Sequence, residues 1–353
     1  MSLAPGRRPH PVGRSAAAAL LLALPAAARP EDPSALESAR TIPHYEYLED
    51  SYLDYFLPNT GPAHDDRLLY DAQAAAHLFL VNTWNRVERP SPAGRPLHVL
   101  SWDVSFLIRL RMIQEQSKPV RPPSYMPTVR GQWFVLWRLG PGEVRELETE
   151  LAVTHHSNGQ QGCSWAVGHD PTRCLPAYGG PDTVNYRSGD FSTTYGALGL
   201  HVARIALDAQ RYLAFRESIG ARYQENFAEN GVLAEAPGSM PGDQAKIYGV
   251  HRLQVEVQGS WHLFPEGVWA AIVSGSLSHE RMWPTSMGVP DNRTIAEASY
   301  TLDQLHGAGV FVRYFTGQDD MNILFAEGRT EKVVFGFVWN TSPGLRYRFG
   351  EEE

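Results

Sequence analysis

The chain has 353 residues, is 43% hydrophobic and carries a net charge of -8, so it is long enough to bury a large core. Acidic residues outnumber basic ones by 39 to 31 and no basic block stands out, which argues against a general nucleic-acid-binding protein. The sequence holds no zinc signature, glycine-rich phosphate loop or nucleotide fingerprint.

The first 28 residues have the pattern of a secretory signal peptide. Three arginines precede SAAAALLLALPAAA (residues 15–28), a short apolar run that ends in small residues. This run is shorter than the ~20 apolar residues that a helix needs to cross a bilayer. We therefore predict a signal peptide over 1–28 that is removed after export.

The segment 29–67 is acidic and aromatic, and prolines interrupt it, as in HYEYLEDSYLDYFLPNTGP (residues 44–62). It shows no clean alternation of apolar and polar residues. We predict an irregular, periplasmic or plug-like segment that lies outside the main fold or caps it.

From residue 68 onward the dominant pattern is a period of two, which is typical of strands with one apolar face. In WDVSFLIRLRM (102–112) every second residue, starting from the tryptophan, is apolar, and most of the others are polar or charged. The same alternation occurs at 252–258 and 296–303, and further runs occur at 68–81, 131–139, 145–157, 191–205, 210–223, 268–277, 309–316 and 331–340. This predicts about a dozen strands, with loops at 259–268 and 279–293.

Two architectures suit such strands: a soluble sandwich or barrel with the apolar face inward, and an outer-membrane barrel with that face outward. The polar faces carry Arg, Glu and Asp on strand after strand, which favours a barrel interior filled by hydrogen-bonded charges. We therefore predict an all-β fold over 68–349: a transmembrane antiparallel β-barrel of about twelve strands, located in the outer membrane of a Gram-negative cell.

The two cysteines, Cys163 and Cys174, lie eleven residues apart in a segment rich in Gly and Pro. They lack the CxxC spacing of redox motifs and have no further cysteines to complete a metal site. In an exported chain they are expected to form a structural disulfide within a loop insertion, 160–184.

The stretch VTHHSNGQ (153–160) places two histidines and a serine at the end of one predicted strand. By parity His155 and Ser157 share the apolar, lipid-facing side, whereas His156 shares the side of the glutamates. Alpha carbons two positions apart are roughly 6.6 Å apart, so the imidazole can reach the hydroxyl as a general base. The alternative is a polar strand end that enters a turn at the membrane interface.

A third residue is expected to orient the ring of His155. A carboxylate facing hydrocarbon carries a large desolvation penalty, so a neutral amide is expected instead. The candidate is Asn185, in TVNYRSGDFSTTY (183–195), because it opens the next long run and an antiparallel hairpin places it beside the first strand. The catalytic interpretation thus depends on His155 and Ser157 projecting outward and on an amide from the neighbouring strand near the ring.

These residues resemble the outer-membrane phospholipases A, in which His-x-Ser-Asn-Gly closes one barrel strand and an asparagine opens the next. Here the motif reads HHSNG (155–159), and VFVRYFTGQDDMNILFAEGRTEKVVFGFVWN (310–340) and DQAKIYGVHRLQVEV (243–257) are similar to later strands of that family. The resemblance covers roughly residues 145–340. It implies a lipid-facing active site that hydrolyses the acyl esters of membrane phospholipids, with Ser157 as nucleophile, His155 as base, Asn185 as orienter and the amide near Gly159 on the oxyanion.

The resemblance also implies calcium dependence and a homodimer, but the chain departs from the family at this point. Asn185 follows Ser157 by 28 residues, farther than in the family, because the disulfide-bearing insertion intervenes, and Gln160 replaces the arginine that follows the family's glycine. The family's calcium ligands therefore do not transfer. Weak candidates on ligand type alone are Asp182, Ser188 and Asp190, together with Asp170.

Two other functions stay open from the sequence. One is a different barrel hydrolase such as a lipid A deacylase, which also uses His-x-Ser. The other is a catalytically silent, porin-like barrel that the insertion covers.

Overall fold

The computed structural model describes residues 51–56, 68–83, 96–113, 120–140, 143–207, 213–229, 238–263, 271–285, 289–302, 305, 308–326 and 328–339. The predicted signal peptide 1–28 and most of the segment 29–67 lie outside the described residues, as do residues 340–353.

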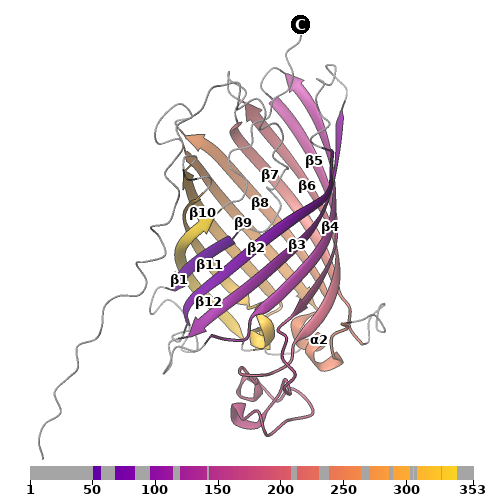
Figure 1. Cartoon of the computed structure of the whole chain (residues 1–353), viewed down its shortest axis with the longest axis vertical. Helices are drawn as coiled ribbons and strands as arrows, with labels where there is room; N and C mark the ends of the chain where they lie inside the picture. The colour runs from indigo at the N-terminus through magenta and orange to yellow at the C-terminus, as the bar shows by residue number, and fades with distance from the viewer. Residues whose placement is uncertain are drawn as a thin grey trace, which may run out of the picture. The chain divides into compact units, whose positions relative to one another are not determined.

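Twelve antiparallel strands close into one barrel (Figure 1), because β1 pairs with both β2 and β12. They are β1 (Ser51–Phe56), β2 (Leu68–Asn82), β3 (Leu97–Ile113), β4 (Ser124–Gly140), β5 (Glu143–Ser157), β6 (Ser192–Leu207), β7 (Leu213–Asn226), β8 (His251–Leu263), β9 (Ala271–Trp283), β10 (Asn292–Leu302), β11 (Ala308–Gln318) and β12 (Arg329–Trp339). The short helices are η2 (Val167–His169), η3 (Pro181–Thr183), α2 (Gly242–Tyr248) and η5 (Asn322–Ala326). The predicted all-β barrel of about twelve strands is confirmed.

The strand boundaries differ from the sequence-based expectation at several strands, among them β1, β4, β8 and β9. The first strand, β1, lies inside the segment 29–67 that was expected to be irregular, so the barrel begins at Ser51 and not at residue 68. The sequence SYLDYF has aromatic residues on both faces, so it lacks the polar face that marks the other strands. Strands β8 and β9 extend to Leu263 and Trp283, into segments expected to be loops, and β4 begins at Ser124.

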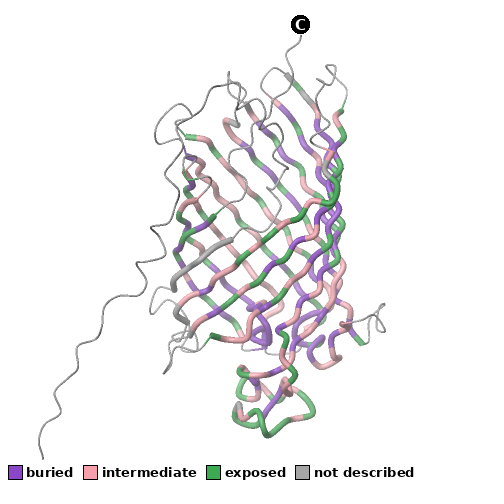
Figure 2. The backbone as a smooth tube through the Cα atoms, viewed as in Figure 1, coloured by how far each residue is buried: buried purple, intermediate pink, exposed green. Residues whose placement is uncertain are grey.

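The barrel is apolar outside and charged inside. Exposed and buried residues alternate along the strands (Figure 2), and the exposed ones include Leu151 at 59% and Leu198 at 60% of their surface. The buried face carries ion pairs instead, such as Arg216 with Glu146 at 3.1 Å. Buried charges are tolerated only when they are paired and hydrogen-bonded. These inward-facing ion pairs therefore determine which face of each strand points outward.

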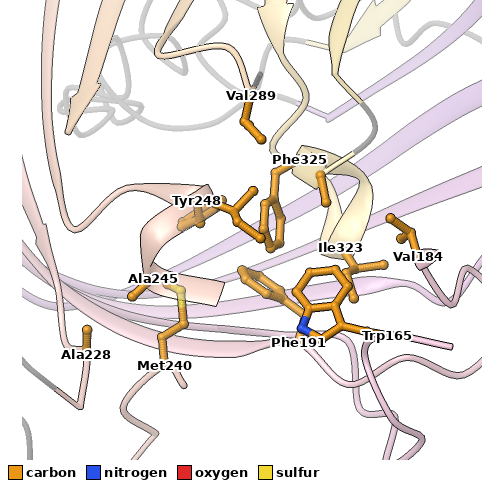
Figure 3. Packing of buried hydrophobic residues seen from close by; sticks show 12 residues of the cluster. Trp165, Val184, Phe191, Ala228, Met240, Ala245, Tyr248, Val289, Ile323 and Phe325 are labelled. Atoms are coloured by element: carbon orange, nitrogen blue, oxygen red, sulfur yellow. The ribbon is translucent and has the colours of Figure 1, made fainter. Parts of the chain in front are cut away.

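One end of the barrel carries an apolar cap built from four connections, β5–β6, β7–β8, β9–β10 and β11–β12 (Figure 3). Its buried residues are Trp165, Val184, Phe191, Ala228, Met240, Ala245, Ile247, Tyr248, Val289, Ile323, Phe325 and Ala326. Phe191 and Phe325 have ring centroids 5.2 Å apart although their connections lie six strands apart around a twelve-stranded ring. The cap therefore spans the mouth of the barrel from side to side.

A charged layer joins the cap to the barrel wall. Asp319 and Asp320 follow β11, and they pair with Arg111 at 2.6 Å and with Arg109 at 3.0 Å, both on β3. Asp320 also pairs with Arg293. Burial alone would raise the pKa of the Asp320 carboxyl, but the guanidinium groups of Arg293 and Arg109 hold that pKa well below its usual range. Asp320 thus stays ionised at neutral pH, and its stabilising contribution is lost only as the pH falls through this lowered value.

Among the described residues, no helix has the length and apolar character needed to cross a membrane.

Candidate functional site

Strand β5 carries His155 and Ser157 on its outer face, as parity predicts. Thr154, before His155, and His156, between His155 and Ser157, are buried, with 2% and 3% of their surface exposed, whereas Val153 is 49% exposed. His155 and Ser157 are half-buried and continue the line of Val153.

The register of β5 is held by its inward-facing glutamates. Glu148 pairs with His201 at 2.6 Å and Glu150 with Arg222 at 2.9 Å. A slip by one residue would turn these carboxylates toward the outside and bury the apolar face, so the two outward positions of the motif are strongly specified.

The two adjacent histidines therefore have different surroundings. His156 lies inside, with its ring edge-on to the ring of Phe191 at 4.9 Å between centroids. His155 lies outside, next to β6. The two imidazoles face opposite sides of the sheet, as neighbouring residues of a strand do.

The ring of His155 is hydrogen-bonded across the strand pair to Thr194 on β6. The two residues are direct cross-strand partners, and the Nδ1 atom lies 3.0 Å from the threonine hydroxyl oxygen. When the Nδ1–H group donates this hydrogen bond to the threonine hydroxyl, the unprotonated nitrogen is Nε2, which is the tautomer that a general base for a serine requires.

Asn185, the amide predicted to orient His155, is placed elsewhere. It is fully buried in the β5–β6 connection, where its Nδ2 donates to the carbonyl of Cys163 at 2.8 Å and to the Ser188 hydroxyl at 3.2 Å. Its Oδ1 accepts from the backbone amides of Arg187 and Ser188. Asn185 therefore stabilises the insertion, and among the described residues the side chain at the Nδ1 atom of His155 is a hydroxyl and not an amide. Of the two conditions for the catalytic interpretation, the outward projection of His155 and Ser157 is therefore met, and the amide beside the ring is not.

Register explains why the sequence interpretation missed Thr194. Strand β6 begins at Ser192, seven residues after Asn185, and Ser192 is the partner of Ser157. Counting back two positions from Ser157 and forward two from Ser192 brings His155 opposite Thr194. The hydroxyl residue lies in the run FSTTY (191–195), but choosing it as the partner of His155 requires knowing where the insertion ends.

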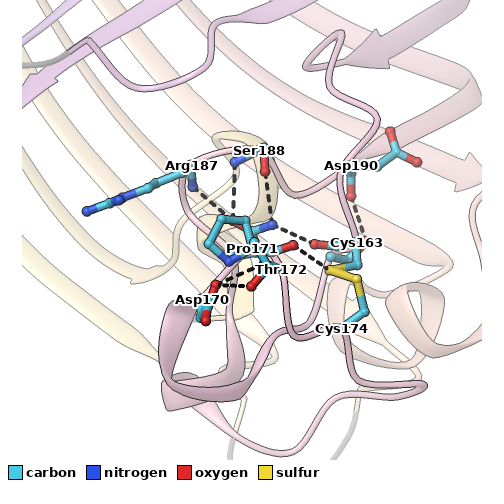
Figure 4. Close-up of a disulfide and its surroundings, with 10 residues drawn as sticks. Cys163, Asp170, Pro171, Thr172, Cys174, Arg187, Ser188 and Asp190 are labelled. Carbon is cyan, nitrogen blue, oxygen red and sulfur yellow. Dashed lines mark hydrogen bonds between the residues drawn. A yellow bond between two sulfur atoms is a disulfide. The ribbon is translucent and has the colours of Figure 1, made fainter.

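The insertion between β5 and β6 is a compact, cross-linked loop (Figure 4). The predicted disulfide between Cys163 and Cys174 is present, with alpha carbons 5.7 Å apart. At its base Asn158 bridges the two strand ends, because its Nδ2 donates to Gly189 O at 2.7 Å and its Oδ1 accepts from the Phe191 amide at 3.1 Å. The insertion thus lengthens the connection without separating the ends of β5 and β6.

Ser157 and Gly159, the predicted nucleophile and oxyanion donor, are unengaged. In the described part of the chain, neither the Ser157 hydroxyl nor the Gly159 amide has a hydrogen-bond partner, and no hydrogen bond joins Ser157 to His155. Catalytic hydrogen bonds are often formed only when substrate is bound. Gly159 has a φ of 65°, a left-handed conformation that turns the chain immediately after the serine.

The residues proposed as calcium ligands do not form a site. Asp182 is exposed on η3, and the Ser188 hydroxyl is used by Asn185. Asp190 is half-buried, and burial raises the pKa of its carboxyl, which disfavours the charged form that calcium binds. Asp170 instead accepts hydrogen bonds from Thr172. Within the described ranges no three His, Cys, Asp or Glu side chains gather to hold a metal ion.

Comparison with known proteins identifies similar folds only. No family model and no curated protein matches the sequence. Among solved structures, outer membrane phospholipase A from Escherichia coli is 15% identical, with a TM-score of 0.46 over 83% of this chain and 90% of the other. The Salmonella typhi outer membrane phospholipase dimer with bound calcium is 13% identical, with a TM-score of 0.45 over 83% and 91%. The β domain of the Bordetella autotransporter Brka is 10% identical, with a TM-score of 0.35 over 82% and 95%.

The His155–Thr194 hydrogen bond predicts a graded response to substitution. Thr194→Ala removes the acceptor at Nδ1, and we expect kcat for ester hydrolysis to fall by about 10- to 100-fold because the ring and its tautomer are no longer fixed. Thr194→Ser keeps the hydroxyl and should retain activity within about threefold. Steady-state kinetics on a soluble ester in micelles measures both.

Asn185→Ala is the matched comparison. It should lower the thermal stability of the insertion but leave kcat closer to the wild-type value than Thr194→Ala does. A larger loss of kcat in Asn185→Ala than in Thr194→Ala would restore the asparagine as the orienting residue.

Proposed function

We propose that this protein is an outer-membrane phospholipase A that hydrolyses acyl esters at the outer surface of its barrel. The observation that carries the proposal is the hydrogen bond between His155 and the neutral hydroxyl of Thr194, two positions along β5 from the unengaged hydroxyl of Ser157. A polar strand end that only enters a turn needs no such arrangement.

The proposed chemistry follows acyl transfer by an activated serine. Ser157 attacks the ester carbonyl as Nε2 of His155 takes the hydroxyl proton, and His155 then gives that proton to the leaving alcohol. The Gly159 amide donates to the oxyanion. Water releases the fatty acid from the acyl-enzyme by the same steps, with His155 again as base.

A neutral hydroxyl suits the position beside Nδ1 of His155 for the same reason that led us to expect an amide there, namely the desolvation cost of a carboxylate. A carboxylate at the edge of the acyl region would lose hydration without a compensating partner, whereas a threonine hydroxyl costs far less to desolvate. It also stabilises the imidazolium less than a carboxylate does, so we expect a modest kcat.

The barrel's surface supports a membrane location. Apolar side chains on the outside and paired charges on the inside are the distribution of a transmembrane barrel. The connections are asymmetric as well: β4 and β5 are separated only by residues 141–142, whereas residues 158–191 separate β5 from β6 at the site end. Outer-membrane barrels have short periplasmic turns and long extracellular loops, so the site is proposed to lie near the outer leaflet.

A porin-like function is disfavoured by the interior. The cap spans the mouth, and the ion pairs of Asp319 and Asp320 with Arg111 and Arg109 lie next to it, so no open channel is expected. Calcium and a homodimer, both implied by the family resemblance, are not needed for any step above.

Product analysis tests the proposed substrate. The purified protein in mixed micelles is expected to convert phosphatidylethanolamine to lysophospholipid and free fatty acid, and to leave lipid A intact. Fatty acid released from lipid A alone would favour the deacylase. Ion conductance in a planar bilayer without hydrolysis of either lipid would favour the silent barrel.

A further inference from the structure

We infer that Gly238, in the connection between β7 and β8, is a positioning residue of this active site, which holds the His155–Thr194 pair by contact with its bare alpha carbon. The inference rests on the proposed function. Nothing in the motif around Ser157 points to Gly238, which is 81 residues farther along the chain.

The connection between β7 and β8 forms hydrogen bonds with both the amide and the carbonyl of Thr194. The Thr194 amide donates to the Gly238 carbonyl at 2.9 Å, and the Thr194 carbonyl accepts from the Phe227 amide at 2.7 Å. The residue that meets the Nδ1 atom of His155 is therefore fixed by two hydrogen bonds outside the β5–β6 ladder. Such supporting contacts determine how precisely a catalytic side chain is held.

A side chain at position 238 would press against the His155–Thr194 pair. A Cβ atom on Gly238 would lie 2.7 Å from the Thr194 hydroxyl oxygen and 3.0 Å from both Nδ1 and Cε1 of His155. The 2.7 Å approach is shorter than a carbon atom tolerates and the 3.0 Å approaches are tight, so a neighbour must move, and two of the three neighbours are the atoms of the hydrogen bond itself. The φ of 78° adds a backbone preference for glycine. The backbone at Gly238 thus closes the Nδ1 edge of the ring.

The apolar cap holds Gly238 in this place. Met240, two residues later, is fully buried in the cap cluster. Its amide donates to Phe227 O at 2.7 Å and its carbonyl accepts from Glu229 N at 3.1 Å. The packing of the cap is thereby connected to the ring of His155 through Met240, Gly238 and Thr194, and Figure 3 shows Met240 among the packed residues.

Gly238→Ala is expected to lower kcat by about 10- to 100-fold with little change in KM, because the added methyl group displaces the ring or its acceptor and not the lipid. The matched control is Gly168→Ala. Gly168 also has a positive φ, 57°, but a Cβ there meets nothing within 4 Å, so this variant carries backbone strain without a clash. It should keep wild-type kcat.

A double-mutant cycle separates positioning from general damage. If Gly238 acts through Thr194, then Gly238→Ala adds little to Thr194→Ala, and the two single losses are not additive. The acid limb of the pH profile of kcat/KM should also move in Gly238→Ala and stay in place in Gly168→Ala, since only the former alters the surroundings of the imidazole.

The inference is overturned if Gly238→Ala has the kcat of Gly168→Ala, or if its loss adds fully to that of Thr194→Ala. Should Gly238→Ala alone not fold, the double variant with Thr194→Ala removes the closest clash. We expect it to fold with the activity of Thr194→Ala, and a double variant that is unfolded or a further tenfold slower would overturn the inference. Failure of the proposed function is a separate result, because wild-type protein would then hydrolyse no ester through Ser157.

Discussion

Ser157→Ala is expected to lower ester hydrolysis by about 10³-fold or more while the barrel stays folded. The hydroxyl is the atom that forms the acyl-enzyme, and no other residue of the HHSNG motif can replace it. The side chain is half-buried on the outer face and has no hydrogen-bond partner among the described residues, so removing its oxygen leaves no buried group unpaired. Hydrolysis in detergent micelles, with circular dichroism and heat-modifiable electrophoretic mobility as tests of folding, measures the two effects separately.

Ser192→Ala is the control for this variant. Ser192 is the direct cross-strand partner of Ser157 and shares its outer face, so both substitutions remove a hydroxyl from the same patch. Activity should stay within about threefold of wild type in Ser192→Ala. Equal losses in the two variants would mean that the patch, and not a particular nucleophile, supports hydrolysis.

His155→Gln is expected to lower kcat by a similar factor, because without the base the serine hydroxyl stays protonated near neutral pH. Glutamine keeps a polar side chain of comparable size at the membrane edge, so the barrel should fold. Since base and nucleophile act as one unit, the variant with both substitutions should be about as slow as either single variant. The comparison requires only the rates of the three proteins on one ester.

The variant His156→Gln tests whether the chemistry uses the outer or the inner face of β5. Its ring is buried and packs edge-on against Phe191 in the cap, so this change should lower thermal stability more than it lowers kcat. The opposite outcome, an inactive His156→Gln with an active His155→Gln, would show that the chemistry uses the inner face of β5.

Which face of β5 points outward was predictable because two independent features of the sequence indicate it. Leu151 and Val153 need a lipid-facing surface and the glutamates need partners inside, so both requirements assign His155 and Ser157 to the outside. The disulfide was also predictable, because the sequence has two cysteines and each has only the other as a partner.

The orienting residue and the first strand were not predictable to the same degree. The position opposite His155 depends on where a 34-residue connection, residues 158–191, rejoins the sheet, and no local pattern marks that point. Strand β1 forms because it pairs with β12, so that its position depends on a contact between the first and the last strand of the chain. The role that we infer for Gly238 was not predictable for the same physical reason, because it depends on contacts of the β7–β8 connection with His155 and Thr194 and not on the neighbours of Gly238 in sequence.

Covalent labelling tests the central claim most directly, namely that an activated serine faces the acyl chains. A fluorophosphonate with a long alkyl chain, incubated with the folded protein in micelles and mapped by mass spectrometry, is predicted to modify Ser157 alone, and at least about 100-fold more slowly in His155→Gln. Labelling of another residue, or the same rate of Ser157 labelling in His155→Gln, would contradict the account.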